Sequence, residues 1–170
     1  MVVTTPVRTW LDLGTRLGLA DLVAVGDHII HHRLATVAQL RMALEARSDR
    51  RGRALLHHAL DLLSDRAESP QESILRVLVH QAGLPEPLVN VDVRDEVGRF
   101  VARPDLRFEE WGIALEYLGD YHRTDPAQWR REGSRRADLA SHGVRVLEVF
   151  APDLLDPEAL IKKILRLARA

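Results

Sequence analysis

The segment PDLRFEEWGIALEYLGDYH, residues 104–122, contains the apolar run IALEYL with one acidic residue, Glu116, at its centre. An apolar run of this length between glycines predicts a buried β-strand. Burial of a carboxylate costs several kcal/mol unless a cation or hydrogen-bond donors compensate it. The segment therefore predicts a buried strand whose Glu116 side chain lies in the interior of a domain.

Around this strand, helix and strand signals alternate. Ser69, Pro70 and Glu72 form the start signal of a helix that closes at Gly83. Residues 88–101 alternate apolar and polar side chains around the turn DEVG, which predicts a hairpin. A further strand at 144–150 and helices at 125–143 and 156–170 complete the order α-β-β-β-α-β-α.

The first third of the chain has apolar residues only at helical spacing, with Gly18 between two helices. We therefore predict a small helical N-terminal region over residues 1–66 and an α/β domain over residues 67–170. The second domain is expected to contain a mixed four-stranded sheet between layers of helices.

The amino-acid composition limits the kinds of partner, metal site and cellular location that the protein can have. Lys and Arg number 24 against 25 Asp and Glu, so the net charge favours neither a nucleic acid nor a basic partner. The chain has no cysteine, which excludes disulfides and thiolate metal sites and is typical of a reducing cytoplasm. No apolar run reaches the ~18 residues of a membrane span. We therefore expect a cytoplasmic protein without membrane association.

Asp105 and Glu116 are candidate metal ligands. If the strands that carry them pair antiparallel, the two carboxylates can meet at one edge of the sheet. Two carboxylates, a carbonyl group and water form the oxygen-rich shell that Mg²⁺ accepts. The sequence leaves two alternatives open, in which Glu116 faces solvent or forms an ion pair with an arginine.

The helix expected at 125–143 is rich in arginine. Arg131 and Arg135 share one face at i, i+4 spacing, with Gln128 one turn before. These three residues are candidate phosphate contacts, which would make DNA the partner. A solvated surface stripe is the alternative reading.

The chain also resembles a known family. The run from ESPQESILRVLVHQAG through RPDLRF and IALEYLGDYHRTDPAQWRRE to GVRVLEVF, roughly residues 66–155, is similar to the very-short-patch-repair endonuclease-like domain. That domain belongs to the PD-(D/E)XK nuclease superfamily, whose restriction-endonuclease-like core has three layers. Longer relatives carry a winged-helix, antitoxin-like module upstream.

The resemblance implies a hydrolase that cleaves phosphodiester bonds of DNA with Mg²⁺ or Mn²⁺. It makes Asp105 and Glu116 the metal ligands, Glu72 the acid on the first core helix, and His122 a proton-transfer residue. Leu118 departs from the pattern, because relatives have Asp there and the wider superfamily has Lys. The alternative is a catalytically inactive nuclease fold, related to toxin–antitoxin proteins, that binds DNA or protein. A homo-oligomer or a partner protein would then use the helical N-terminal region.

Overall fold

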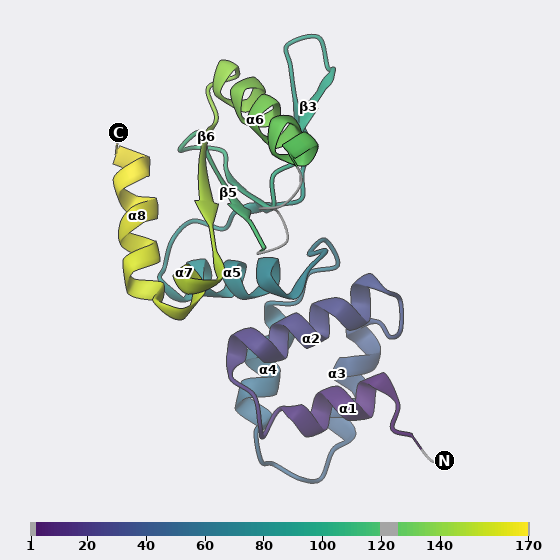
Figure 1. The fold of residues 1–170 in the computed structure, drawn as a ribbon. Helices are drawn as coiled ribbons and strands as arrows, with labels where there is room; N and C mark the ends of the chain where they lie inside the picture. Colours follow the sequence, from purple (N-terminus) through teal and green to yellow (C-terminus); the bar gives the residue numbers. More distant parts are fainter. Residues whose placement is uncertain (1–2, 120–125, 170) are drawn as a thin grey trace. The chain divides into compact units, whose positions relative to one another are not determined.

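A computed structural model describes residues 3–119 and 126–169 of the chain. The chain divides into two compact units, Met1–Leu78 and Val79–Ala170. The division falls inside helix α5 (Pro70–Gln81). The domain boundary expected between residues 66 and 67 stays a prediction. Figure 1 shows the order of the elements along the chain.

The first unit is helical, as the sequence predicts. It contains α1 (Pro6–Leu13), α2 (Leu19–His31), α3 (Val37–Ala46), α4 (Arg53–Asp61) and the greater part of α5. Helix α3 starts with a capping box in which the Thr36 hydroxyl accepts from the Gln39 N–H while the Gln39 side chain accepts from the Thr36 N–H. Gly52 precedes α4 with φ +69° and lies against the Gly14 carbonyl, where a Cβ would come within 2.2 Å of the oxygen.

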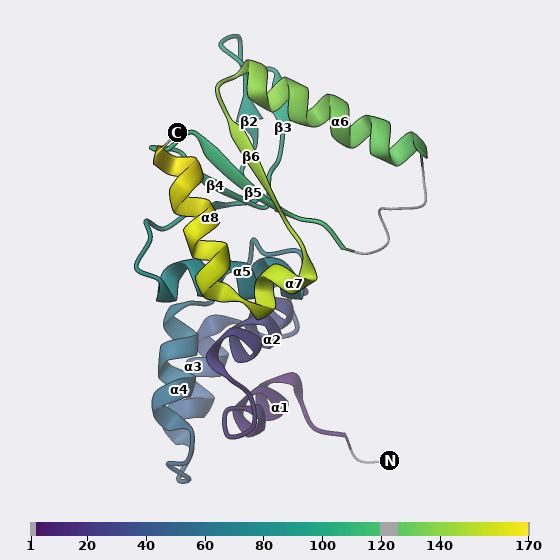
Figure 2. The same cartoon turned by 60° about the vertical axis from the view of Figure 1, so that its left-hand side comes forward.

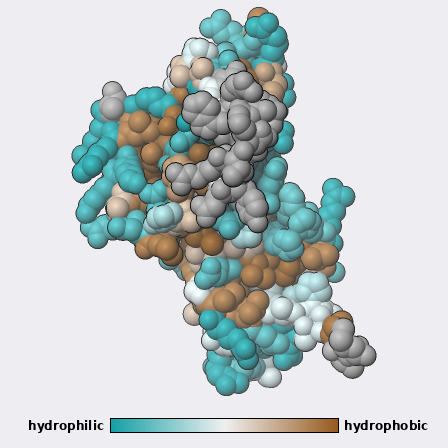
Figure 3. Space-filling view, viewed as in Figure 1, coloured by the Kyte–Doolittle hydropathy of each residue, from teal (hydrophilic) through white to brown (hydrophobic). Residues whose placement is uncertain are grey.

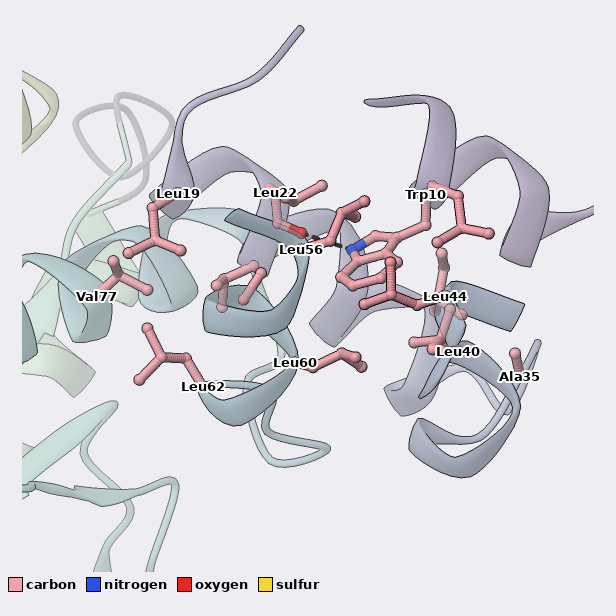
Figure 4. Packing of buried hydrophobic residues seen from close by; sticks show 14 residues of the cluster. Trp10, Leu19, Leu22, Ala35, Leu40, Leu44, Leu56, Leu60, Leu62 and Val77 are labelled. Carbon is pink, nitrogen blue, oxygen red and sulfur yellow. Dashed lines mark hydrogen bonds between the residues drawn. The ribbon is translucent and has the colours of Figure 1, made fainter. Parts of the chain in front are cut away.

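Trp10 lies at the centre of the helical core. Its side chain is completely buried, and its indole N–H donates to the Leu22 carbonyl oxygen at 3.0 Å. Figure 4 shows the indole beside Leu44 and Leu56. The core closes around a tryptophan because its single polar atom finds a backbone acceptor there.

A buried ion pair crosses this unit. Asp27 on α2 is 1% exposed and accepts from the Arg76 guanidinium of α5 at 2.8 Å and from the Ser64 N–H at 2.7 Å. Burial raises the pKa of Asp27, and the attraction of Arg76 opposes that rise. Both carboxylate oxygens of Asp27 therefore have a donor, and the pair ties α2 to the middle of α5.

The second unit contains six strands and three helices among the residues that the structure describes. The strands are β1 (Leu88–Val89), β2 (Val93–Arg94), β3 (Phe100–Ala102), β4 (Leu106–Phe108), β5 (Ile113–Tyr117) and β6 (Arg145–Val149). The helices are α6 (Pro126–Ser141), α7 (Ala151–Leu155) and α8 (Pro157–Arg169).

A mixed four-stranded sheet forms the centre of the second unit, as predicted. Its order is β1-β4-β5-β6, with β5 and β6 parallel and the other neighbours antiparallel. The predicted hairpin is correct only around its turn, where β2 pairs with β3 in a separate two-stranded sheet. The beginning of the predicted hairpin, Leu88–Val89, instead pairs with β4, because Asn90 takes a positive φ and turns the chain away.

Helices α6 and α8 pack against different faces of the sheet. Ala114 and Val146 face α6, where they share a core with Leu139. Arg145 points to the other face, and its guanidinium donates to the Leu167 carbonyl of α8 at 2.6 Å. Figure 2 shows α8 and α6 beside different parts of the sheet. The second unit is thus α/β in class, with helices on both faces.

The surface carries scattered apolar side chains. Within residues 3–119 and 126–169, no helix has the length and apolar character needed to cross a bilayer. The face in Figure 3 mixes apolar and hydrophilic residues. The most exposed large apolar side chains, Met42, Val97 and Leu155, are far apart in the sequence, which is normal for a folded protein.

The Asp27–Arg76 pair gives a testable prediction. We expect Arg76→Met to lower the free energy of unfolding of the helical unit by about 3–5 kcal/mol, because Asp27 then stays buried without its cation. The double variant Asp27→Asn with Arg76→Met should recover most of this loss. Hydrogen exchange of the buried α2 amides measures both values, and an equal loss in the two variants would contradict the ion-pair explanation.

Candidate functional site

Three carboxylates lie in a row across three neighbouring strands. Glu116 is in β5, Glu148 is its direct partner in β6, and Asp105 immediately precedes β4. Leu106 pairs with Leu115, so the same register brings Asp105 opposite Glu116. Directly opposed residues project to the same face of a sheet. The row therefore faces α6, as Ala114 and Val146 do.

Glu116 is the buried member of the row. Its side chain is 4% exposed, and its Oε2 accepts from the Arg135 guanidinium of α6 at 2.7 Å. Its Oε1 is fully buried and has no hydrogen-bond partner among the residues that the structure describes. Of the alternatives considered from the sequence, the pairing with an arginine is the one that the structure contains, and among the described residues it satisfies one of the two carboxylate oxygens.

Burial raises the pKa of Glu116 above its ordinary value of 4.5. The attraction of Arg135 lowers this pKa but does not cancel the effect of burial, and the nearby negative charge of Glu148 raises it further. The positive charge of Arg136 also lowers this pKa, so two guanidinium groups of α6 together compensate the burial of Glu116 in part.

Asp105 is held by the backbone of β5. Its Oδ2 accepts from the Tyr117 N–H at 2.7 Å, and its carbonyl oxygen accepts from the Asn90 N–H at 3.0 Å. These bonds fix Asp105 at the junction of β1, β4 and β5. Leu118 follows β5 directly, and its N–H donates to the Val149 carbonyl at 2.8 Å, which keeps it beside β6.

Glu148 is a site residue that the sequence reasoning missed. Its Oε1 accepts from the Arg136 guanidinium, next to Arg135 on α6. The strand alternation VRVLEV signals that Glu148 shares a face with Val146, but the register with β5 depends on a long-range pairing. Two adjacent arginines of α6 thus meet two adjacent glutamates of the sheet.

The other predicted residues are placed as follows. Glu72 is in the first unit, 8% exposed, and its Oε2 accepts from the Glu68 N–H at 2.9 Å, so it serves the start of α5. His122 lies outside the described residues. Gln128 and Arg131 belong to α6, and their side chains lie outside the described part of the structure. Arg135 contacts an acid, and its role toward phosphate stays a prediction.

The donor set fits a divalent cation at Glu116. Asp105 and Glu116 share a face at neighbouring positions, and no described residue donates to the buried Glu116 Oε1. Carboxylate oxygens are the ligands that Mg²⁺ and Mn²⁺ prefer. In the described parts of the chain, no three His, Asp or Glu side chains are grouped closely enough to hold a metal ion by themselves. An ion at Glu116 would complete its shell with water.

Comparisons with known proteins give distant relatives only. The chain is 24% identical over 164 residues to two uncharacterised proteins of Mycobacterium tuberculosis, from strains CDC 1551 / Oshkosh and H37Rv. The match covers 96% of this chain and 60% of each relative, so the chain spans less than two thirds of their length. No family model matches the chain, and no solved structure matches it significantly.

The pKa of Glu116 gives a second prediction. Since its folded-state pKa is raised, its contribution to stability is fully present below the unfolded value and is lost as pH rises through the folded value. We expect the wild type to lose stability relative to Glu116→Gln as the pH rises above 4.5, the ordinary pKa of the side chain, toward its raised folded-state pKa. Hydrogen exchange of the β5 amides in both proteins measures the difference, and a difference that does not change with pH would contradict the prediction.

Proposed function

We propose that the chain is a metal-dependent DNA endonuclease that hydrolyses phosphodiester bonds. In this proposal the α/β unit is a restriction-endonuclease-like core of the PD-(D/E)XK superfamily, close to the very-short-patch-repair type. The observation that carries it is Glu116, a buried carboxylate whose Oε1 has no hydrogen-bond partner in the described part of the chain, opposite Asp105 on the same face of a mixed sheet. A structural carboxylate would be expected to have all its oxygens satisfied.

Each residue has a defined role in the proposed reaction. Asp105 and Glu116 would hold Mg²⁺ or Mn²⁺, which supplies charge stabilisation for the phosphodiester and activation of water. Asp105 is pre-oriented by the Tyr117 N–H, so its remaining lone pairs keep one direction. His122 is proposed to transfer a proton. Gln128, Arg131 and Arg135 are proposed to bind the DNA phosphates.

A second candidate is a nuclease fold that binds DNA or protein without cleaving it, in a toxin–antitoxin context or as a homo-oligomer. Two observations favour it. Arg135 already occupies Glu116 Oε2. Leu118 offers no ligand or hydrogen-bond donor in its side chain where the resemblance expects Asp or Lys. Both features would weaken catalysis while leaving the sheet and α6 intact.

Plasmid nicking distinguishes the two candidates. We expect weak cleavage with Mg²⁺ or Mn²⁺, none with EDTA, and a gain of about 10–100-fold for Leu118→Asp, the range for changes that surround a metal site. Asp105→Asn should abolish the reaction, because its carboxylate is a proposed metal ligand.

Glu109→Gln serves as the control, because Glu109 is an exposed acid that pairs with Arg107 after β4 and is outside the proposed site. Absence of cleavage in both the wild type and Leu118→Asp would support the non-catalytic candidate. Cleavage that persists unchanged in Asp105→Asn would show that the active residues lie elsewhere.

A further inference from the structure

Three histidines lie together at the C-terminal end of α2. His28, His31 and His32 follow each other at i, i+3 and i+4 spacing, which places their side chains on one side of the helix end. The ring centroids of His28 and His32 are 4.3 Å apart, and those of His31 and His32 are 5.0 Å apart. His32 is therefore the central member of a compact group of imidazoles.

The separations of these rings match those of imidazoles that share a metal ion. Zn²⁺ binds histidine nitrogen at about 2.0–2.1 Å, so two rings that ligate one ion have centroids roughly 4.5–5 Å apart. The rings do not converge on one point as they lie, because among the described residues no three His, Asp or Glu side chains are grouped closely enough to hold an ion. The χ2 angle of histidine has a broad distribution, so ring rotation brings the nitrogens together without a backbone movement.

A hydrogen bond fixes the tautomer of His31. Its Nδ1 lies 2.9 Å from the Asp65 carbonyl oxygen, which only accepts, so Nδ1 carries the hydrogen. The neutral ring then has its free lone pair on Nε2. Histidines that ligate metals usually donate their other ring N–H to a carbonyl or a carboxylate in this way. His31 is thus held in the tautomer that offers Nε2 to a metal ion.

The surroundings of the three rings suit a single cation. The histidines line a cavity of about 10 Å³, together with Glu68 and Ser73. This volume accommodates about one water molecule, which fits an ion better than an organic ligand. The C-terminal end of α2 attracts positive charge. The N-terminal end of α5 has the opposite effect, but Glu68 before it and Glu72 in its first turn bring negative charge to that side.

We propose that His28, His31 and His32 form a binding site for Zn²⁺, with water completing the coordination. Imidazole nitrogen suits Zn²⁺, whereas Mg²⁺ prefers oxygen ligands. The site therefore differs in chemistry from the carboxylates of the sheet, and it does not depend on the proposed function. Through His31 and its bond to Asp65, the ion joins the end of α2 to the segment that precedes α5. Zn²⁺ binding thus stabilises the folded helical unit.

The test measures Zn²⁺ affinity of the full chain by isothermal titration calorimetry in excess Mg²⁺, which occupies oxygen sites. His32→Gln removes the central ring and should weaken Zn²⁺ binding by at least about tenfold, the lower end of the losses seen around metal sites. His142→Gln is the matched control, because His142 is likewise an exposed histidine that directly follows a helix. Equal affinities of the two variants, or displacement of Zn²⁺ by Mg²⁺, would overturn the site.

A second measurement uses the wild type alone and does not depend on the folding of a variant. In ¹⁵N NMR spectra of the histidine rings, Zn²⁺ should shift Nε2 of His31 while Nδ1 keeps its hydrogen. The ring signals of His28 and His32 should shift at the same Zn²⁺ concentration, and those of His142 should not. Equal shifts of all four histidines would indicate an adventitious ion only and would overturn the site, as would the absence of any shift.

Discussion

The second unit is organised by the need to compensate one buried charge. Glu116 lies in a strand whose other residues are apolar, and its side chain is almost completely buried. An ion of this kind is stable in the interior only when a cation lies beside it. Helix α6 supplies that cation through Arg135 and packs against the sheet through Leu139. The register of β5 with β6 adds Glu148, which gives Arg136 an acid of its own.

The helical unit contains a useful comparison. Asp27 is also a buried carboxylate held by an arginine, but a backbone N–H bonds its other oxygen, so both oxygens are satisfied. Glu116 has the same kind of arginine partner and an oxygen without a donor in the described residues. The two carboxylates therefore differ in how completely their oxygens are satisfied, while the Arg76 Nε of the first pair is also buried without a partner among the described residues.

The sequence predicts local structure better than long-range pairing. The start signal at Ser69 depends on a neighbour three positions away, and the helix that it predicts is present. The partner of Leu88–Val89 and the position of Glu148 beside Glu116 depend on which strands meet, and no local pattern encodes that choice. The acid pair Asp105 and Glu116 was predictable because it combines a local motif with one antiparallel pairing. The roles of His122, Gln128 and Arg131 stay predictions.

The parallel pairing of β5 with β6 has a consequence for how the chain folds. Ile113 and Arg145 are neighbours in the sheet but lie far apart in the sequence, with α6 between them. The helical unit, in contrast, is built from helices joined by short connections. Chain closure over a long segment must precede the stabilising contacts of a parallel pair, so such topologies fold slowly. Refolding should begin with rapid formation of the helical unit, and the acids and arginines should come together only in the slow phase that joins β6 to β5.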